Sequence, residues 1–138
     1  MDIVIYISDA NNLDGIDKSS YFSNNKNTIY WNSRQAFSTT NAVILSPTTI
    51  LNHEADHALQ AKTHYKKWVK EIQEDKKNPY ESKEEERVIT GSEQRTAKAL
   101  GEIGEEEKTR DNHKSANTII TDSPISVITN DSGVVIKP

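Results

Sequence analysis

Two histidines lie four residues apart in the segment His53-Glu54-Ala55-Asp56-His57. Residues i and i+4 of an α-helix share one face, so both imidazoles can bind the same cation. Glu54 is offset from that face and can take a proton from a water that the cation activates. The chain has no cysteine, so a zinc site must use imidazole and carboxylate ligands. The spacing therefore predicts one Zn²⁺ ion held by His53 and His57, with Glu54 as the general base.

The sequence around the motif predicts a buried helix. Ser46 can cap a helix N-terminus and Pro47 suits its first turn, so we expect a helix from Pro47 to at least Ala61. Apolar residues occur on most of its circumference, which favours burial inside the domain. Buried histidines need partners, and a pair with a purely structural role is the alternative to a metal site. Asp56 could support an imidazole or cap a neighbouring loop.

A catalytic zinc ion needs a third protein ligand. The extended HExxHxxGxxH pattern requires glycine and histidine where this chain has Gln60 and Thr63, so that class is excluded. The run Glu84-Glu85-Glu86-Arg87 follows His57 after enough residues for a connection and a returning helix. Charged runs are usually solvated surface, and spacing alone does not choose among these glutamates.

Length and composition indicate a single domain covering residues 1–138. Only 33% of the residues are hydrophobic and the mean hydropathy is -0.77, so we expect a small core. The net charge of -4 argues against a nucleic-acid partner. No apolar run approaches the roughly 20 residues of a membrane span, and we expect none. No signal peptide is visible, so we expect any secretion signal to lie elsewhere in a larger protein.

The pattern of elements predicts an α+β fold. Short β-rich runs bounded by polar turn residues are typical of hairpin strands, and they precede the histidine-bearing helix. An amphipathic, charged stretch over 62–80 follows, with a loop at Asn78-Pro79, and then a helix over 84–100 that Gly91-Ser92-Glu93 could interrupt. A β-type tail completes the chain. The expected strands are 3–7, 28–31, 42–45, 118–120 and 134–136.

Four segments in order resemble the zinc metallopeptidase toxin domains at the C-termini of RHS-repeat-associated polymorphic toxins of bacteria. They are 51–58, 84–93, 100–102 and 110–113. The resemblance covers a core of about 42–115 and implies a small zincin-like fold with zinc endopeptidase activity. It also implies a module of a larger secreted or contact-delivered protein that cleaves a protein inside a target cell. A cognate immunity protein would neutralise it.

The pattern is more distantly similar to effector metalloproteases and clostridial neurotoxin light chains. In those light chains, HExxH is followed by Glu-Glu-x-Arg, whose second glutamate binds zinc. Aligned on Arg87, this similarity implies that Glu85 is the third ligand and Glu84 supports the site. An alignment shifted to Gly91 selects Glu86 instead. Glu93 is a further candidate, because members of the toxin family also carry a glutamate there.

The segment Arg110-Asp111-Asn112-His113 matches the Arg-x-x-Tyr pair of the light chains, with histidine in place of tyrosine. The similarity implies that Arg110, together with His113, stabilises the oxyanion of the reaction. The imidazole could instead orient another group.

Two other functions are compatible with the same motifs. One is a non-peptidase zinc hydrolase on this scaffold, and the other is a catalytically silent interaction module that retains zinc for stability.

Overall fold

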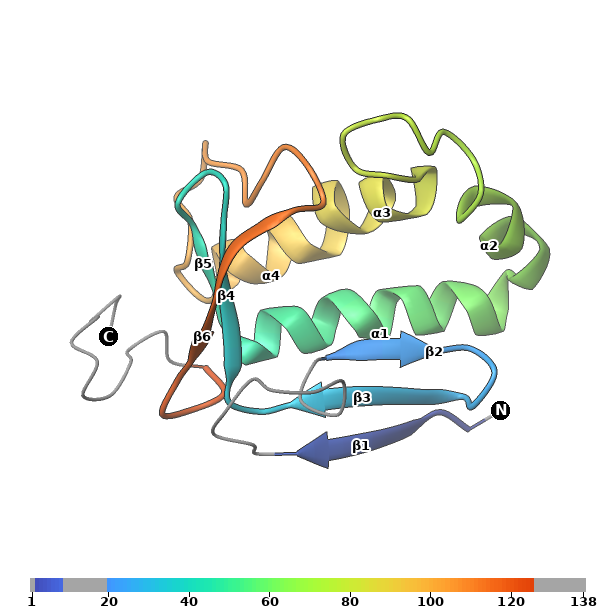
Figure 1. Ribbon diagram of the computed structural model, residues 1–138, viewed down its shortest axis with the longest axis horizontal. Helices are drawn as coiled ribbons and strands as arrows, with labels where there is room; N and C mark the ends of the chain where they lie inside the picture. The colour runs from blue at the N-terminus through green and yellow to red at the C-terminus, as the bar shows by residue number, and fades with distance from the viewer. Residues whose placement is uncertain (1, 9–19, 126–138) are drawn as a thin grey trace.

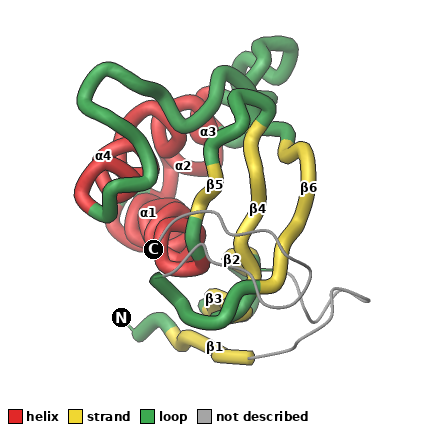
Figure 2. Tube along the Cα trace, turned by 90° about the vertical axis from the view of Figure 1, so that its left-hand side faces the viewer, coloured by secondary structure: helices red, strands yellow, loops and turns green. Residues whose placement is uncertain are grey.

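The computed structural model describes residues 2–8 and 20–125, and within them the chain forms an α+β fold. A long helix, α1 (Pro47–Thr63), lies between a small sheet and the later helices (Figure 1). The sheet has the order β1-β3-β2, and a second sheet with the order β5-β4-β6 stands beside the start of α1 (Figure 2). The strands are β1 (Val4–Ser8), β2 (Tyr21–Ser23), β3 (Thr28–Asn32), β4 (Gln35–Thr39), β5 (Ile44–Leu45) and β6 (Ser115–Ile120).

Helix α1 begins as the sequence predicts. The Ser46 hydroxyl oxygen accepts a hydrogen bond from the Thr49 N–H, and Pro47 lies in the first turn. The helix ends at Thr63, and after His64 the chain enters a separate helix, α2 (Tyr65–Glu71). Turns occupy most of the remainder up to Ser82, so the charged stretch over 62–80 is less helical than expected.

Strand β3 belongs to a hairpin, but its partner is not one of the strands that the sequence predicted. Strands β2 and β3 are antiparallel and joined by a polar turn in which Asn27 adopts a left-handed conformation that asparagine tolerates. Strand β1 pairs with β3 in parallel, so these two strands are not a hairpin. Strands β2 and β4 were not predicted from the sequence. The run 118–120 falls within β6, whereas 134–136 lies outside the described residues.

The predicted helix over 84–100 is continuous but irregular. It consists of α3 (Lys83–Val88), a π-helical turn (Ile89–Glu93) and α4 (Gln94–Ala99). The expected break at Gly91-Ser92-Glu93 is therefore wrong. The backbone widens there into a π turn, and the helix continues. Such turns are rare and often occur at functional sites.

The core is small and contains many polar groups. Its apolar cluster joins the second sheet to α1 and α4 and consists of Val43, Leu45, Ile50, Ala97 and Ile103, with Phe37 packed against it. Polar side chains that are also fully buried include Asn32, Thr39, Thr49, Thr109 and Thr121. Within the described part of the chain, no helix combines the length and apolar character of a membrane span.

Glu102 fixes the start of α1 to the segment that follows α4. Its Oε1 accepts hydrogen bonds from the Ser46 N–H at 3.3 Å and the Thr49 hydroxyl at 2.9 Å. Its Oε2 is buried without a hydrogen-bond partner among the described residues. Burial raises the pKa of Glu102, and the hydrogen bonds from Ser46 and Thr49 only partly oppose this shift.

We expect the free energy of unfolding of the Glu102→Gln variant to increase, relative to that of the native chain, as pH rises. Above the ordinary pKa of a carboxyl group the unfolded chain loses the Glu102 proton readily, whereas the folded chain loses it only near its raised pKa. Ionisation of Glu102 therefore lowers the stability of the native protein across this interval, and the uncharged amide removes that contribution. Urea unfolding at pH 4, 6 and 8 measures the difference, with the exposed Glu106→Gln as control. A stability difference that does not change with pH would contradict the prediction.

Candidate functional site

The Nε2 atoms of His53 and His57 and the carboxylate of Glu85 form a triangle with nearly equal sides. The two Nε2 atoms are 3.1 Å apart, and each lies 3.1 Å from an oxygen of Glu85. Ligands at tetrahedral positions with bonds of 2.0–2.1 Å are about 3.3 Å apart. The three donor atoms therefore have the spacing of one face of a tetrahedral metal shell.

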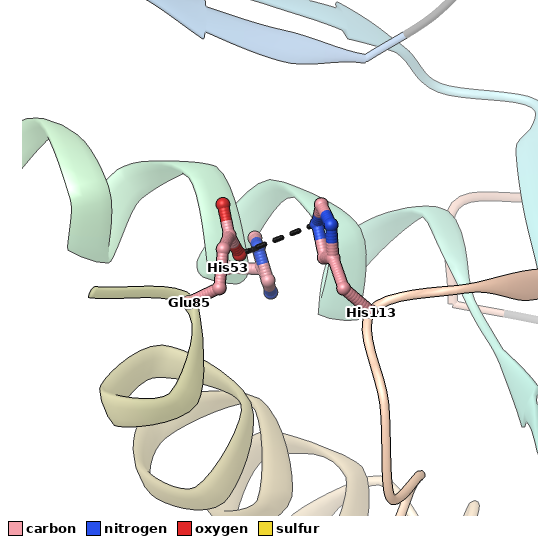
Figure 3. Close-up of side chains that lie close together, drawn as sticks. All are labelled: His53, Glu85 and His113. Carbon is pink, nitrogen blue, oxygen red and sulfur yellow. Dashed lines mark hydrogen bonds and ion pairs between the residues drawn. The ribbon is translucent and has the colours of Figure 1, made fainter. Parts of the chain in front are cut away.

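His113 lies at the edge of this triangle. Its Nε2 is 3.4 Å from Glu85 Oε1, and His53, Glu85 and His113 form a group that could hold a metal ion (Figure 3). Two sets of three ligands are thus possible, and both contain His53 and Glu85. We favour the set with His57, because its donor distances are shorter and its imidazole is buried, whereas the His113 side chain is 34% exposed.

The three principal residues come from two elements that face each other. His53 and His57 lie one turn apart on α1, and Glu85 lies in the first turn of α3. Ser82 caps that helix, and its hydroxyl oxygen accepts a hydrogen bond from the Glu85 N–H at 3.0 Å. In many helices a glutamate at this position would bond back to the cap residue. Here its carboxylate is directed to the two imidazoles instead.

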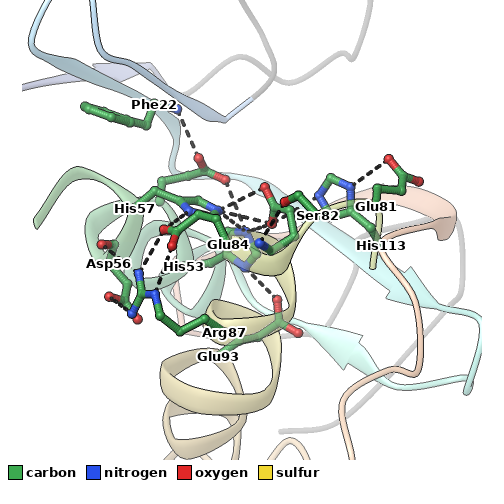
Figure 4. Close-up of polar contacts among 12 residues, drawn as sticks. Phe22, His53, Asp56, His57, Glu81, Ser82, Glu84, Arg87, Glu93 and His113 are labelled. Atoms are coloured by element: carbon green, nitrogen blue, oxygen red, sulfur yellow. Dashed lines mark hydrogen bonds and ion pairs between the residues drawn. The ribbon is translucent and has the colours of Figure 1, made fainter. Parts of the chain in front are cut away.

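One network of polar contacts orients His57 (Figure 4). Its Nδ1 is 2.9 Å from Glu84 Oε2. Arg87 donates to both oxygens of Glu84 at 2.9 Å and to Asp56 at 3.0 Å. The other oxygen of Asp56 accepts a hydrogen bond from the Ser92 hydroxyl. Asp56 therefore acts on the imidazole through Arg87, and it does not contact the triangle directly.

A second network orients His53. Its Nδ1 is 2.8 Å from Glu93 Oε1. Arg110 donates to both oxygens of Glu93, at 2.6 and 3.0 Å, and the Thr109 hydroxyl donates at 2.7 Å. Glu93 and Arg110 are almost completely buried, with side chains 1% and 4% exposed. Each imidazole is thus held at Nδ1 by a carboxylate, which leaves Nε2 directed to the triangle.

The π turn explains how Glu93 reaches this position. In a regular helix, Glu85 and Glu93 would point in directions about 80° apart, because eight residues cover slightly more than two turns. One additional residue in a π turn reduces that difference to about 20°. The turn therefore brings Glu93 to the side of the helix that faces α1, as Glu85 does.

The carboxylates set the electrostatics of the site. Burial lowers the pKa of His57, but hydrogen bonds to Glu84 and Glu85 outweigh this effect and raise it to about 10. The pKa of His53 is raised as well, since its hydrogen bonds to Glu85 and Glu93 also outweigh burial. Burial would raise the pKa of Glu85 and Glu93, but the imidazoles hold that of Glu85 well below its usual range and, with Arg110, bring that of Glu93 to about 2. A metal ion would therefore compete with protons for the imidazoles.

Glu54 lies beside the triangle but outside it. Its Oε2 is 3.8 Å from His53 Nε2, and its Oε1 accepts a hydrogen bond from the backbone N–H of Phe22 in β2 at 3.0 Å. It lines both cavities that open beside the triangle. Glu54 is therefore fixed by the strand next to α1 while remaining available to a molecule bound in the cleft.

The structure brings most of the candidate residues of the sequence together. His53, His57 and Glu85 form the triangle, and Glu54 and His113 line the cleft beside it. Glu84, Glu93 and Asp56 belong to the supporting networks, and Glu86 instead accepts a hydrogen bond from Asn78 at 3.3 Å. The guanidinium of Arg110 is engaged by Glu93, so its role in oxyanion stabilisation stays a prediction.

Several supporting residues were missed. Phe22 acts through its backbone, which carries no sequence signal. Glu81 accepts a hydrogen bond from His113 Nδ1 at 3.2 Å, and Thr109 donates to Glu93. Ser82 could have been found, because Ser82-Lys83-Glu84-Glu85 has the spacing of a helix-capping box.

Comparison with known proteins provides no relative for this arrangement, since no protein-family model, no curated protein and no solved structure matches the chain.

Removing Arg110 should destabilise the fold. The Arg110→Met chain would retain Glu93 as a buried carboxylate that has lost its guanidinium partner, at a cost of about 3–5 kcal/mol. The free energy of unfolding from urea titration measures this cost. Arg95→Met, in the exposed part of α4, is the matched control and should change stability by about 0.5 kcal/mol or less. Equal stability of the two variants would show that the buried pair of Arg110 and Glu93 does not stabilise the fold.

Proposed function

We propose that this protein is a zinc-dependent endopeptidase. One observation carries the proposal: two Nε2 atoms and a carboxylate form a 3.1 Å triangle beside Glu54, and these residues line two adjacent surface cavities. The HExxH motif is the sequence basis of the same proposal. A structural histidine pair would not require a glutamate that stands beside the donor atoms and faces the cleft.

The donor set fits zinc. Imidazole nitrogen and carboxylate oxygen are zinc ligands, and a set of two histidines and one glutamate occurs in catalytic sites that keep a position open. His53, His57 and Glu85 would hold the ion. When bound, zinc supplies a Lewis acid that activates water and polarises the peptide carbonyl.

Glu54 is the general base of the proposed reaction. Its carboxylate accepts the proton of the attacking water and transfers it to the nitrogen of the leaving amine. The hydrogen bond from the Phe22 N–H occupies Oε1 and leaves Oε2, the oxygen nearer to His53, for this transfer.

His113 is the proposed stabiliser of the oxyanion. Its side chain lines both cavities, is partly exposed and is oriented by Glu81. Arg110 donates to the His113 carbonyl at 3.4 Å as well as to Glu93, so we propose that it positions both residues.

The biological setting is a further part of the proposal and rests on the resemblance to polymorphic toxin domains. It comprises delivery within a larger protein, cleavage of a protein in the target cell and neutralisation by an immunity protein. The motifs of that resemblance contribute residues of the site, namely His53, His57, Glu85, Glu93 and His113.

Zinc should bind with a stoichiometry of one, and its affinity should depend unequally on the three consecutive glutamates. Glu85→Ala removes a ligand and should weaken binding by more than about 100-fold, whereas Glu84→Ala removes the partner of His57 and should cost about 10–100-fold. Glu86→Ala is the control and should leave affinity unchanged. Competition with a chromophoric chelator measures these constants. Equal losses for Glu85→Ala and Glu86→Ala would contradict the ligand assignment.

Glu54→Gln should retain zinc and lose hydrolysis. The amide cannot accept the proton of water, so cleavage of an unfolded protein substrate should fall by at least about 10²-fold. Mass spectrometry of the products measures cleavage, and metal analysis verifies zinc content. Full activity of this variant would disprove the mechanism. A native protein that binds zinc but cleaves no polypeptide would disprove the peptidase function.

A further inference from the structure

Two cavities adjoin the triangle, and Glu54 lines both of them. The smaller, of about 170 Å³, extends past His53, and the larger, of about 380 Å³, extends past His57. Both are lined by Ser20, Glu54 and His113, so they are adjacent at the proposed reaction centre, and together we call them the cleft. A substrate bound across the cleft would place its residues in both.

The two ends of the cleft differ in chemistry. The end beside His53 is lined by Gln35, Glu93 and Arg110 together with Phe37 and Ile50. The end beside His57 is lined by Phe22 from β2, Trp68 from α2 and Ile72 just after α2. We call this end of the cleft the apolar pocket. The Phe22 and Trp68 rings meet edge to face, with centroids 6.2 Å apart. This contact is a favourable aromatic arrangement, so it joins β2 and α2 into a defined wall.

The carboxylates and imidazoles that line the apolar pocket all belong to the proposed reaction centre. They are Glu54, His57, Glu85 and His113, and the remaining described residues of the wall offer no charged partner to a bound side chain. The Lys62 ammonium lies 5.9 Å from the centre of the Phe22 ring and donates to the Asn24 side chain at 2.9 Å. A small polar side chain would lose water against Phe22, Trp68 and Ile72. The side chains of Phe22 and Ile72 have no hydrogen-bonding group, and the Trp68 Nε1, which has no partner among the described residues, is buried.

We propose that the apolar pocket binds a large apolar or aromatic side chain of the polypeptide substrate, close to the cleaved bond. This assignment rests on the proposed peptidase function. The continuity of the pocket with Glu54, His57 and Glu85 identifies its occupant as part of the reacting polypeptide. Trp68 and Ile72 are therefore specificity-determining residues, and the substrates are polypeptides with Phe, Tyr, Trp, Leu or Met beside the cleavage site.

The first experiment measures cleavage preference. Zinc-loaded protein is incubated with a peptide library from a digested proteome, and mass spectrometry identifies the residues around each new terminus. One position within two residues of the cleaved bond should favour large apolar side chains over Ser or Asp by at least about tenfold. Trp68→Ala and Ile72→Ala should abolish the preference. Leu100→Ala, an exposed apolar residue at the end of α4, should retain it.

A flat profile, or a preference that survives in correctly folded Trp68→Ala and Ile72→Ala proteins, would overturn the pocket assignment while leaving the peptidase function intact. Circular dichroism verifies the folding of each variant. Complete absence of cleavage would instead overturn the peptidase function, and a second experiment then decides on the pocket.

That second experiment measures binding without hydrolysis. Zinc-loaded Glu54→Gln protein is titrated with N-acetyl-phenylalanine amide and with N-acetyl-serine amide, and tryptophan fluorescence is recorded. The phenylalanine probe should bind at least about tenfold more tightly, and Ile72→Ala should remove the difference. Trp68→Phe should remove most of the signal, because Trp31 is the chain's only other tryptophan. Equal affinities for the two probes would overturn the assignment.

Discussion

The hydrogen bonds from the Nδ1 atoms of His53 and His57 to Glu93 and Glu84 determine the geometry of the site. An imidazole has two nitrogens, and a carboxylate at one of them fixes the ring and directs the other. Because both rings are fixed in this way, both Nε2 atoms face Glu85 at 3.1 Å. Without these two contacts the rings could rotate, and the HExxH spacing alone would not place three donors around one point.

These carboxylates are themselves buried, and burying a charge is costly unless it is paired and hydrogen-bonded. The chain meets this requirement twice in the same way, with an arginine that donates to both oxygens. Arg87 does so for Glu84, and Arg110 does so for Glu93. Both arginines lie far from the histidines in sequence, so the site depends on the packing of α1 against α3, the π turn and the segment after α4. The geometry of the site therefore forms only when the tertiary structure forms.

The sequence predicted the parts that depend on local rules. Ser46 and Pro47 mark the start of α1, and His53 and His57 follow from helical periodicity. Parallel pairing of β1 with β3 was not predictable, because alternating β-type residues do not specify the direction of a partner strand. The π turn was also missed, since Gly91-Ser92 in a helical pattern indicates an interruption more often than a widened turn. Glu85 was selected by similarity to other proteins, whereas its contacts with the two imidazoles are visible only in three dimensions.

The charge pattern of the chain does not distinguish charged residues of the site from charged residues of the solvated surface. Residues 62–108 carry 23 of the 38 charged side chains, and most such runs are solvated. Three consecutive glutamates within this run have three different environments: Glu84 is buried against His57, Glu85 faces the cleft and Glu86 contacts Asn78. Consecutive helical residues point about 100° apart, so only the docking of α3 on α1 determines which one enters the site. Adjacent positions of identical chemistry therefore acquire different environments from the way one short helix packs on α1.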